Sequence, residues 1–258
     1  MRIFAVPAAL LLACCIYMPL PATRDLLFRL IRRAYAASLR LFTRRTGHTD
    51  DIPALASFLL LLAGVLALLG AMHPLVSMVL MAPAFTGLCV LPGCACVKDE
   101  LDSGKYARDI PAYEALVRST CTELVPACIQ GVISPMLLGA LGMPLHLGAA
   151  FGGVYVTLMA LRDTLPVASR ICSAVHRVSG HLFVFFMRLC SGVVGRNPLR
   201  IKGSTCEQRL LSTLGIAGDG SDTHAPMSGD IAQGVFLCGF SCVILCFALY
   251  AVGFVLCR

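Results

Sequence analysis

A stretch without charge decides the fold of this chain. Residues 53–97 read PALASFLLLLAGVLALLGAMHPLVSMVLMAPAFTGLCVLPGCACV, and these 45 residues contain no Lys, Arg, Asp or Glu. One membrane-spanning helix needs about 20 apolar residues, so the stretch is too long for a single span. His73-Pro74 lies near its middle, where proline removes a backbone donor from a helix. The pattern therefore predicts two spans, at 54–72 and 75–96, joined by a tight turn.

The composition of the whole chain agrees with a membrane protein. Hydrophobic residues make up 58% of its 258 residues, charged residues make up 14%, and the mean hydropathy is +0.83. Soluble domains carry about 25% charged residues. This difference excludes a disordered chain and argues against a soluble domain. We expect an all-α, polytopic integral membrane protein, with residues 1–258 forming a single membrane domain.

Apolar runs predict six spans in all, counting the two above. The first run can also be interpreted as a signal peptide, or as a lipoprotein signal that ends at Cys14, but its length favours an uncleaved helix. A shorter run at 182–194 contains Arg188, which is costly in hydrocarbon, so we expect an interfacial or re-entrant segment there. The four further spans are expected at 3–20, 124–141, 145–161 and 231–257.

The basic residues predict how these spans are oriented. The chain has 21 Lys and Arg against 14 acids, a net charge of +7. Six spans place the loops at 21–52, 97–123 and 162–230 on one side, and these loops hold 19 of the 21 basic residues. By the positive-inside rule that side is cytoplasmic. We therefore expect a bacterial inner-membrane protein with both termini outside the cytoplasm. The sequence has no nucleic-acid recognition motif, so we expect no nucleic-acid partner.

Residues 24–45 have the pattern of an amphipathic helix. At 100° per residue, five arginines fall within an arc of about 120°, and apolar side chains lie opposite. A helix of this kind lies in the membrane interface, so the bilayer is its expected partner. The alternative is a surface that binds an anionic substrate. The arginines are Arg29, Arg32, Arg33, Arg40 and Arg44, and the apolar residues are Leu27, Leu30, Ile31, Ala34, Leu41 and Phe42.

Common catalytic motifs are absent from the sequence. It contains no GxxxxGK[ST] or GxGxxG phosphate-binding loop, no GxSxG elbow and no HExxH helix. The 14 cysteines include no CxxC pair and no zinc-finger spacing. Cys238, Cys242 and Cys246 recur every four residues on one helix face, where we expect them to pack or to face lipid.

Polar residues beside the spans are the candidates for function. Glu123 stands at the edge of a span, ahead of Gln130, and Arg162-Asp163 closes another span. Each can also be a charge at a helix end or a local ion pair. Asp219, Asp222, His224 and Asp230 lie in a glycine-rich loop, which is either solvated or able to hold Mg²⁺ with phosphates.

Five weak motifs follow one another along the chain: His73-Pro74, Gly131 to Pro135, Gly142 to Leu145, Arg162 to Pro166 and Glu207 to Ile216. Their order resembles that of motifs in the adenosylcobinamide-phosphate synthase family of membrane proteins. That family carries a G-x-I-x-P run, a G-x-P-L turn, an apolar helix ending in His-Pro, an R-x-D-D segment followed by L-P, and an E-x-x-x-A-x-x-L-G-I segment. The similarity extends over nearly the whole chain and depends on the order of weak motifs. The corresponding residues are Gly131 to Pro135, Gly142 to Leu145, His73-Pro74, Arg162 to Pro166 and Glu207 to Ile216.

The chain departs from the family where acidic residues are expected. The family has Glu-Asn and then Asp before the glycine of its G-x-I-x-P run. This chain has Pro126-Ala127 and then Gln130. The family's N-T-x-D-S-M segment is reduced here to Thr157-Leu158-Met159.

The resemblance implies a role in cobalamin biosynthesis: amide-bond formation between cobyric acid and aminopropanol or its phosphate. The corrinoid is then the substrate, ATP activates its carboxylate, and Mg²⁺ neutralises phosphate charge. On this reading Glu123 and Asp163 are catalytic and bind Mg²⁺, while Arg162, Arg170, Asp219 and Asp222 bind the nucleotide. Two alternatives remain: a non-catalytic membrane partner or scaffold on the same helices, and a small transporter component. The scarcity of polar residues at mid-span argues against the transporter.

Overall fold

The computed structural model describes residues 5–17, 22–46, 51–85, 88, 90–106, 108–142, 147–193, 203–216 and 224–256. Within these ranges every regular element is a helix and no strand occurs. The expected all-α class is therefore confirmed. In chain order the helices are α1 (Ala5–Tyr17), α2 (Ala22–Thr46), α3 (Asp51–Met72), α4 (Pro74–Met81), a 3₁₀ turn (Ala82–Ala84), α5 (Val90–Asp102), α6 (Ile110–Cys128), a π-turn (Ile129–Ile133), α7 (Ser134–Gly142), α8 (Gly148–Leu161), α9 (Pro166–Ser191), α10 (Cys206–Leu214) and α11 (Ser228–Leu256).

Side-chain caps explain where several helices begin. The His73 ring accepts a hydrogen bond from the Leu75 amide, and Pro74 takes the first helical position of α4, where no donor is needed. Asp109 caps α6 by accepting from the Ala112 amide at 3.1 Å. Thr205 and Gln208 form a capping box at the start of α10. These caps satisfy the amides that the first turn of a helix leaves without an internal partner.

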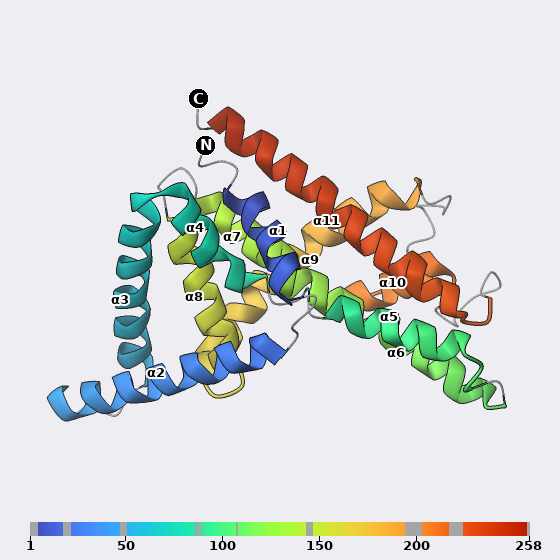
Figure 1. The fold of residues 1–258 in the computed structure, drawn as a ribbon, viewed down its shortest axis with the longest axis horizontal. Helices are drawn as coiled ribbons and strands as arrows, with labels where there is room; N and C mark the ends of the chain where they lie inside the picture. Colours follow the sequence, from blue (N-terminus) through green and yellow to red (C-terminus); the bar gives the residue numbers. More distant parts are fainter. Residues whose placement is uncertain are drawn as a thin grey trace.

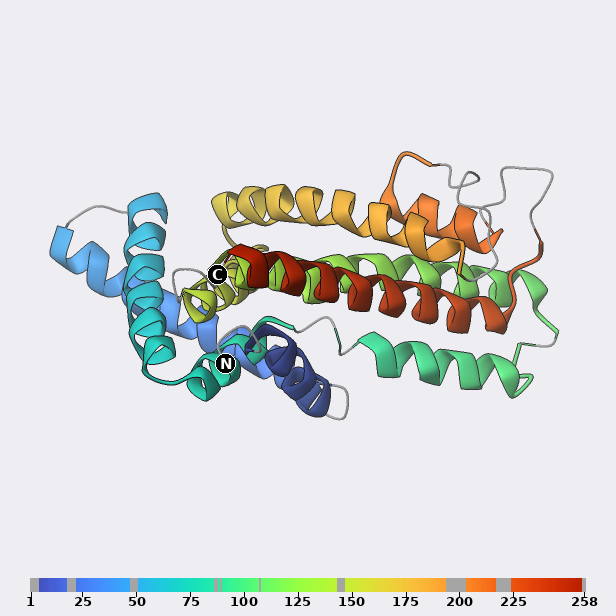
Figure 2. The ribbon, with the colours of Figure 1, turned by 90° about the horizontal axis from the view of Figure 1, so that it is seen from above.

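The helices form two groups. In the larger group α6 and α11 run side by side, α9 and α10 cover one side of them, and α5 covers the other (Figure 2). In the smaller group α3 packs against α8 and α4, and α2 crosses near the base of both α3 and α8 (Figure 1). The α6–α7 stretch belongs to both groups, because α7 packs against α8.

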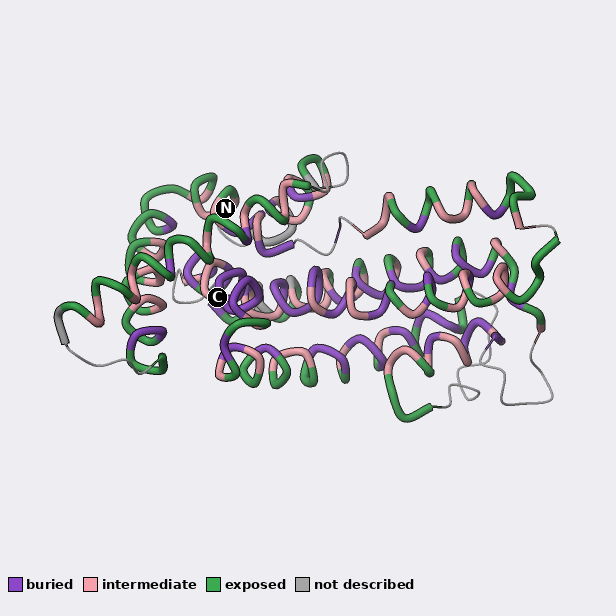
Figure 3. The backbone as a smooth tube through the Cα atoms, turned by 90° about the horizontal axis from the view of Figure 1, so that it is seen from below, coloured by how far each residue is buried: buried purple, intermediate pink, exposed green. Residues whose placement is uncertain are grey.

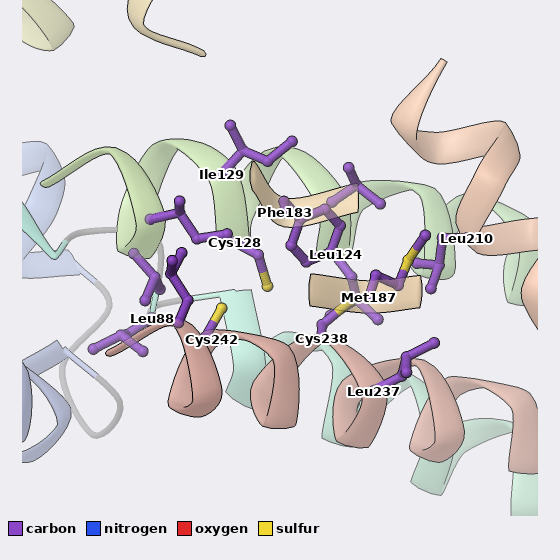
Figure 4. Packing of buried hydrophobic residues seen from close by; sticks show 14 of the residues in the cluster. Leu88, Leu124, Cys128, Ile129, Phe183, Met187, Leu210, Leu237, Cys238 and Cys242 are labelled. Atoms are coloured by element: carbon purple, nitrogen blue, oxygen red, sulfur yellow. The ribbon is translucent and has the colours of Figure 1, made fainter. Parts of the chain in front are cut away.

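Buried residues concentrate on the central helices, as Figure 3 shows. Figure 4 shows Phe183 and Met187 of α9 beside Leu124 of α6 in this core. Cys238 and Cys242 of α11 also lie in it, facing Cys128 of α6. The cysteines of α11 therefore pack inside the protein, one of the two environments predicted for them.

Among the described residues, three helical stretches are long and apolar enough to cross a membrane: α3, the continuous stretch Ile110–Gly142, and Ser228–Leu249 of α11. The prediction of six spans is therefore wrong in number for the described residues. Helices α1, α4 and α8 contain 13, 8 and 14 residues. At 1.5 Å per residue each is about 21 Å long or less, shorter than the bilayer's hydrocarbon core of about 30 Å. The chain is nonetheless a helical protein of membrane-associated character.

The predicted loops are also largely helical. The segment 97–123 contains the end of α5 and more than half of α6, and 162–230 contains α9 and α10. The expected re-entrant segment at 182–194 is mostly the second half of the 26-residue α9. Arg188 is exposed on the outside of that helix, so it does not interrupt it. One face of the helix is buried against α11 and the π-turn, and its outward face carries Arg188 beside exposed apolar side chains.

Helix α3 differs from the other two candidate spans in its surroundings. Only 11% of its most apolar window is buried within the chain, against 61% for Ile110–Gly142. Leu60, Leu61 and Leu68 are each more than 70% exposed. A soluble protein rarely exposes an apolar surface of this extent. The exposed face of α3 is therefore the clearest structural sign of contact with lipid.

Candidate functional site

Several buried and half-buried polar side chains surround the π-turn that follows Pro126. Proline inside a helix removes one backbone hydrogen bond, and here a five-residue π-turn begins three residues after it. The wide turn leaves carbonyl groups that accept side-chain donors. The Ser134 hydroxyl lies 2.7 Å from the Ile129 carbonyl oxygen, and the Tyr155 hydroxyl donates to the Gln130 carbonyl at 2.5 Å. Turns of this type occur often at functional sites.

Further polar side chains extend this network to α9. The Tyr155 hydroxyl lies 3.0 Å from His176 Nε2, and because it donates to Gln130, it accepts from the imidazole N–H. Ser134 and Ser179 are both fully buried, with their hydroxyl oxygens 2.9 Å apart. Each hydroxyl therefore has a partner, which removes most of the cost of burying it.

Arg162 connects the end of α8 to the same turn. Its guanidinium donates to the Gln130 side-chain oxygen at 3.3 Å. We call Gln130, Ser134, Tyr155, Arg162 and His176 the π-turn site. Three helices and the turn contribute to it, so its geometry depends on the packing of α7, α8 and α9 together.

A pocket of about 250 Å³ opens beside the π-turn site. Two of its lining residues are charged: Arg24 of α2, whose guanidinium lies 5.3 Å from the centre of the Phe28 ring, and the exposed Glu123 of α6. The pocket is smaller than the roughly 300 Å³ at the low end of sites for drug-sized ligands. It is too small to enclose a corrin ring. The remaining lining residues are Val90, Pro126, Ala127, Gln130, Gly131 and Met159.

The two predicted catalytic residues, Glu123 and Asp163, contact different parts of the protein. Glu123 lines the pocket, whereas Asp163 is 76% exposed and pairs with Arg32 of α2 at 3.7 Å. Arg32 also donates to the Ala160 carbonyl at 2.7 Å, which holds α2 against α8. Asp163 therefore contributes to the contact between α2 and α8.

Of the other predicted binding residues, the structure describes Arg162 and Arg170, which lie in different surroundings. Arg162 is at the π-turn site, while Arg170 is exposed on the first turns of α9. Asp219 and Asp222 lie outside the described residues. Among the residues that the structure describes, no three His, Cys, Asp or Glu side chains form a group able to hold a metal ion. Mg²⁺ and nucleotide binding therefore remain predictions from the sequence.

The sequence did not single out Ser134, Tyr155, His176 or Ser179. Tyr155 and His176 are separated by 21 residues, and Ser134 and Ser179 by 45. No motif connects residues that far apart, and only the packing of α8 and α9 on the π-turn brings them into contact. The proline ahead of the turn was the one local signal.

His176 at the π-turn site should make the stability of the folded protein depend on pH. Burial, and to a smaller extent the charge of Arg162, lowers its pKa to about 4 from the ordinary value of 6.5. The unfolded chain then takes up a proton near pH 6.5, while the folded chain takes it up only near pH 4. We therefore expect stability to fall as the pH is lowered from about 6.5 to 4.

This expectation can be checked by measuring unfolding in detergent between pH 7 and pH 4. His176→Gln should weaken the decline relative to the wild-type protein. His181→Gln is the matched control, because it removes an exposed imidazole from the same helix. A decline that is identical in the wild type and His176→Gln would contradict the assignment.

The chain was compared with protein families, curated proteins and solved structures. No protein-family model matches it. No curated protein and no solved structure matches it either. The family resemblance therefore depends on the sequence motifs alone.

Proposed function

We propose that this protein binds a small polar ligand in the pocket beside the π-turn, as a non-catalytic membrane protein of cobamide metabolism. The contact between Gln130 and Arg162 carries the proposal. In the resembled family the position of Gln130 is an aspartate and the position of Arg162 is an arginine. In this chain a neutral amide meets the guanidinium, so the carboxylate that acid–base or metal chemistry would use at this position is absent.

The walls of the pocket indicate the kind of ligand. Arg24 and Glu123 offer one positive and one negative group to the same small space. Aminopropanol phosphate has a phosphate for the arginine and an ammonium for the glutamate. It is also small enough for a pocket of about 250 Å³. This is the smaller of the two molecules that the resembled family joins, and we propose it as the ligand.

Retained amide synthesis is the second candidate, and the position of Glu123 favours it. Pro126 and Ala127 stand where the family has Glu-Asn, and Glu123 lies one turn earlier on the same pocket wall. A carboxylate there can take the proton of an amine nucleophile. This candidate also requires ATP and Mg²⁺, and it requires the corrinoid to reach the pocket with only its side chain.

Complementation distinguishes the two candidates. The chain is expressed in a bacterium that lacks the family enzyme and is supplied with cobyric acid as its only corrinoid, and blotting confirms that the protein reaches the membrane. We expect no growth, because the described residues place only one carboxylate at the pocket. Growth would show that amide synthesis is retained and would overturn the non-catalytic proposal.

Binding tests the pocket directly. We expect Glu123→Gln to weaken the binding of aminopropanol phosphate about tenfold, because a charged hydrogen bond in a small pocket contributes about 1.5 kcal/mol or more. Titration calorimetry on the full chain in nanodiscs measures this change. Glu114→Gln is the control, since it removes the same charge from the same helix outside the pocket. Equal affinities for all three proteins, or no binding to the wild type, would contradict the assignment.

A further inference from the structure

The outward surface of α2 carries two adjacent rows of side chains. Its inward surface is fixed by the burial of Phe28 and Tyr35 and by the bond from Arg32 to the Ala160 carbonyl. At 100° per residue, an arginine row covers about 60° of the outward surface and a leucine row covers the next 60°. The arginine row is Arg29, Arg33, Arg40 and Arg44, all exposed. The leucine row is Leu26, Leu30 and Leu41, which are 53%, 53% and 60% exposed.

This arrangement differs from the one that the sequence suggested. The predicted apolar face divides in two: Leu27 and Ile31 pack against the protein, whereas Leu30 and Leu41 remain exposed beside the arginines. The outward surface is therefore amphipathic in itself. It offers apolar side chains along one edge and positive charge along the other.

We propose that this surface docks on a bilayer that contains anionic phospholipids. The leucine row enters the boundary of the acyl chains, and the arginine row contacts the lipid phosphates. Interfacial helices combine these two features, and a guanidinium matches a pair of phosphate oxygens. The site is separate from the pocket, so it does not depend on the proposed ligand.

The charge of the arginine row is available to an external anion. Arg29 donates from Nε to the Asp25 carbonyl at 3.3 Å, a backbone contact that leaves its charge in place. No acidic side chain among the described residues forms an ion pair with Arg33, Arg40 or Arg44. Lipid phosphates supply the missing negative charge.

The orientation of α2 relative to α3 also agrees with binding to a bilayer surface. It crosses the base of α3, the candidate span with the most exposed apolar surface (Figure 1). When α3 crosses the membrane, α2 lies along the membrane surface. With 25 residues, α2 is about 37 Å long, enough to place both rows in the interface over their full length.

The absence of tryptophan from the chain makes a direct test possible. Leu41→Trp introduces a single fluorophore at an exposed position of the leucine row. The full-length protein is reconstituted in phosphatidylcholine vesicles with or without phosphatidylglycerol, and lipids with brominated acyl chains serve as quenchers. We expect blue-shifted emission in the anionic vesicles and quenching about threefold stronger than in the neutral vesicles.

Charge variants identify the source of this preference. Replacing Arg33, Arg40 and Arg44 with Gln in the Leu41→Trp protein should remove the difference between the two kinds of vesicle. The control replaces three exposed arginines elsewhere, Arg108, Arg177 and Arg188, and should retain the difference. Leu26→Trp serves as a second reporter on the same row if the first variant does not fold.

Three results would overturn the proposal. Emission typical of tryptophan in water, in both kinds of vesicle, would place the surface outside the bilayer. Equal quenching in neutral and anionic vesicles would remove the role of lipid charge. Blue-shifted emission without quenching would show that protein covers the surface, as in a dimer of this chain.

Discussion

Replacing Phe183 with Ala is expected to lower the free energy of unfolding by about 3 kcal/mol. Phe183 is fully buried in α9 and lies among Leu124, Met187 and other core residues (Figure 4). Phe→Ala changes in protein cores cost about 3–5 kcal/mol through lost contacts and the cavity that remains. We expect the lower end of this range, because unfolded helices in a membrane exchange protein contacts for equally apolar lipid.

The buried cysteines of the chain provide the measurement. Cys121, Cys128 and Cys238 are buried and react with a thiol-specific fluorogenic dye only after the bundle opens. Unfolding in mixed detergent micelles, followed with this dye, gives the change in free energy. Phe185→Ala is the matched control, since Phe185 is 57% exposed on the same helix and its loss should cost well under 1 kcal/mol. Equal effects of the two variants would show that α9 does not bury the face described here.

The helical and membrane-associated character of the chain could be predicted because it follows from composition and run length. The span expected at 54–72 corresponds to α3, Asp51–Met72, and the one at 231–257 to α11. The number of spans was wrong because run length does not show where a helix ends. The apolar run at 75–96 is divided into α4, a 3₁₀ turn and α5. The span expected to begin at Leu124 is part of α6, which already begins at Ile110 in the polar segment.

The candidate site could be predicted only in part. Glu123 and Arg162 were singled out because charges beside apolar runs are visible in the sequence. Their environments were not, because the contact from Arg162 to Gln130 joins residues 32 positions apart and requires the π-turn. Asp163, selected on the same grounds as Arg162, pairs with Arg32 instead. Neighbouring residues on a helix point in different directions, and a sequence motif cannot say which one faces the pocket.

Asp230→Ala is expected to cost about 2–3 kcal/mol of stability. Asp230 is 3% exposed and accepts a hydrogen bond from the Met227 amide at 2.8 Å, and both carboxylate oxygens lie 3.1 Å from His224 Nε2. A carboxylate that caps the start of a helix contributes about 1 kcal/mol, and hydrogen bonds to a buried charge contribute more than neutral ones. Alanine removes the carboxylate and leaves His224 without this contact.

Two further variants distinguish how much of this loss of stability comes from the buried contact and how much from the helix cap. Asp109→Ala removes the exposed cap of α6 and should cost only about 1 kcal/mol. Asp230→Asn keeps an oxygen for the Met227 amide but loses the charge, so its effect should fall between those of the wild type and Asp230→Ala. Equal losses for Asp109→Ala and Asp230→Ala would show that the buried contact with His224 adds nothing.

Loss of Asp230 should act on stability without changing the pocket. The start of α11 is tied to α6 near Tyr113, whose hydroxyl accepts from the Ser228 amide at 2.8 Å. Gln130 lies farther along the same continuous stretch, nearly five helical turns from Tyr113. We therefore expect Asp230→Ala to bind aminopropanol phosphate as the wild type does wherever both are folded. A weakened affinity under those conditions would show that the packing of α11 on α6 sets the geometry of the π-turn site, and would make that packing part of the binding mechanism.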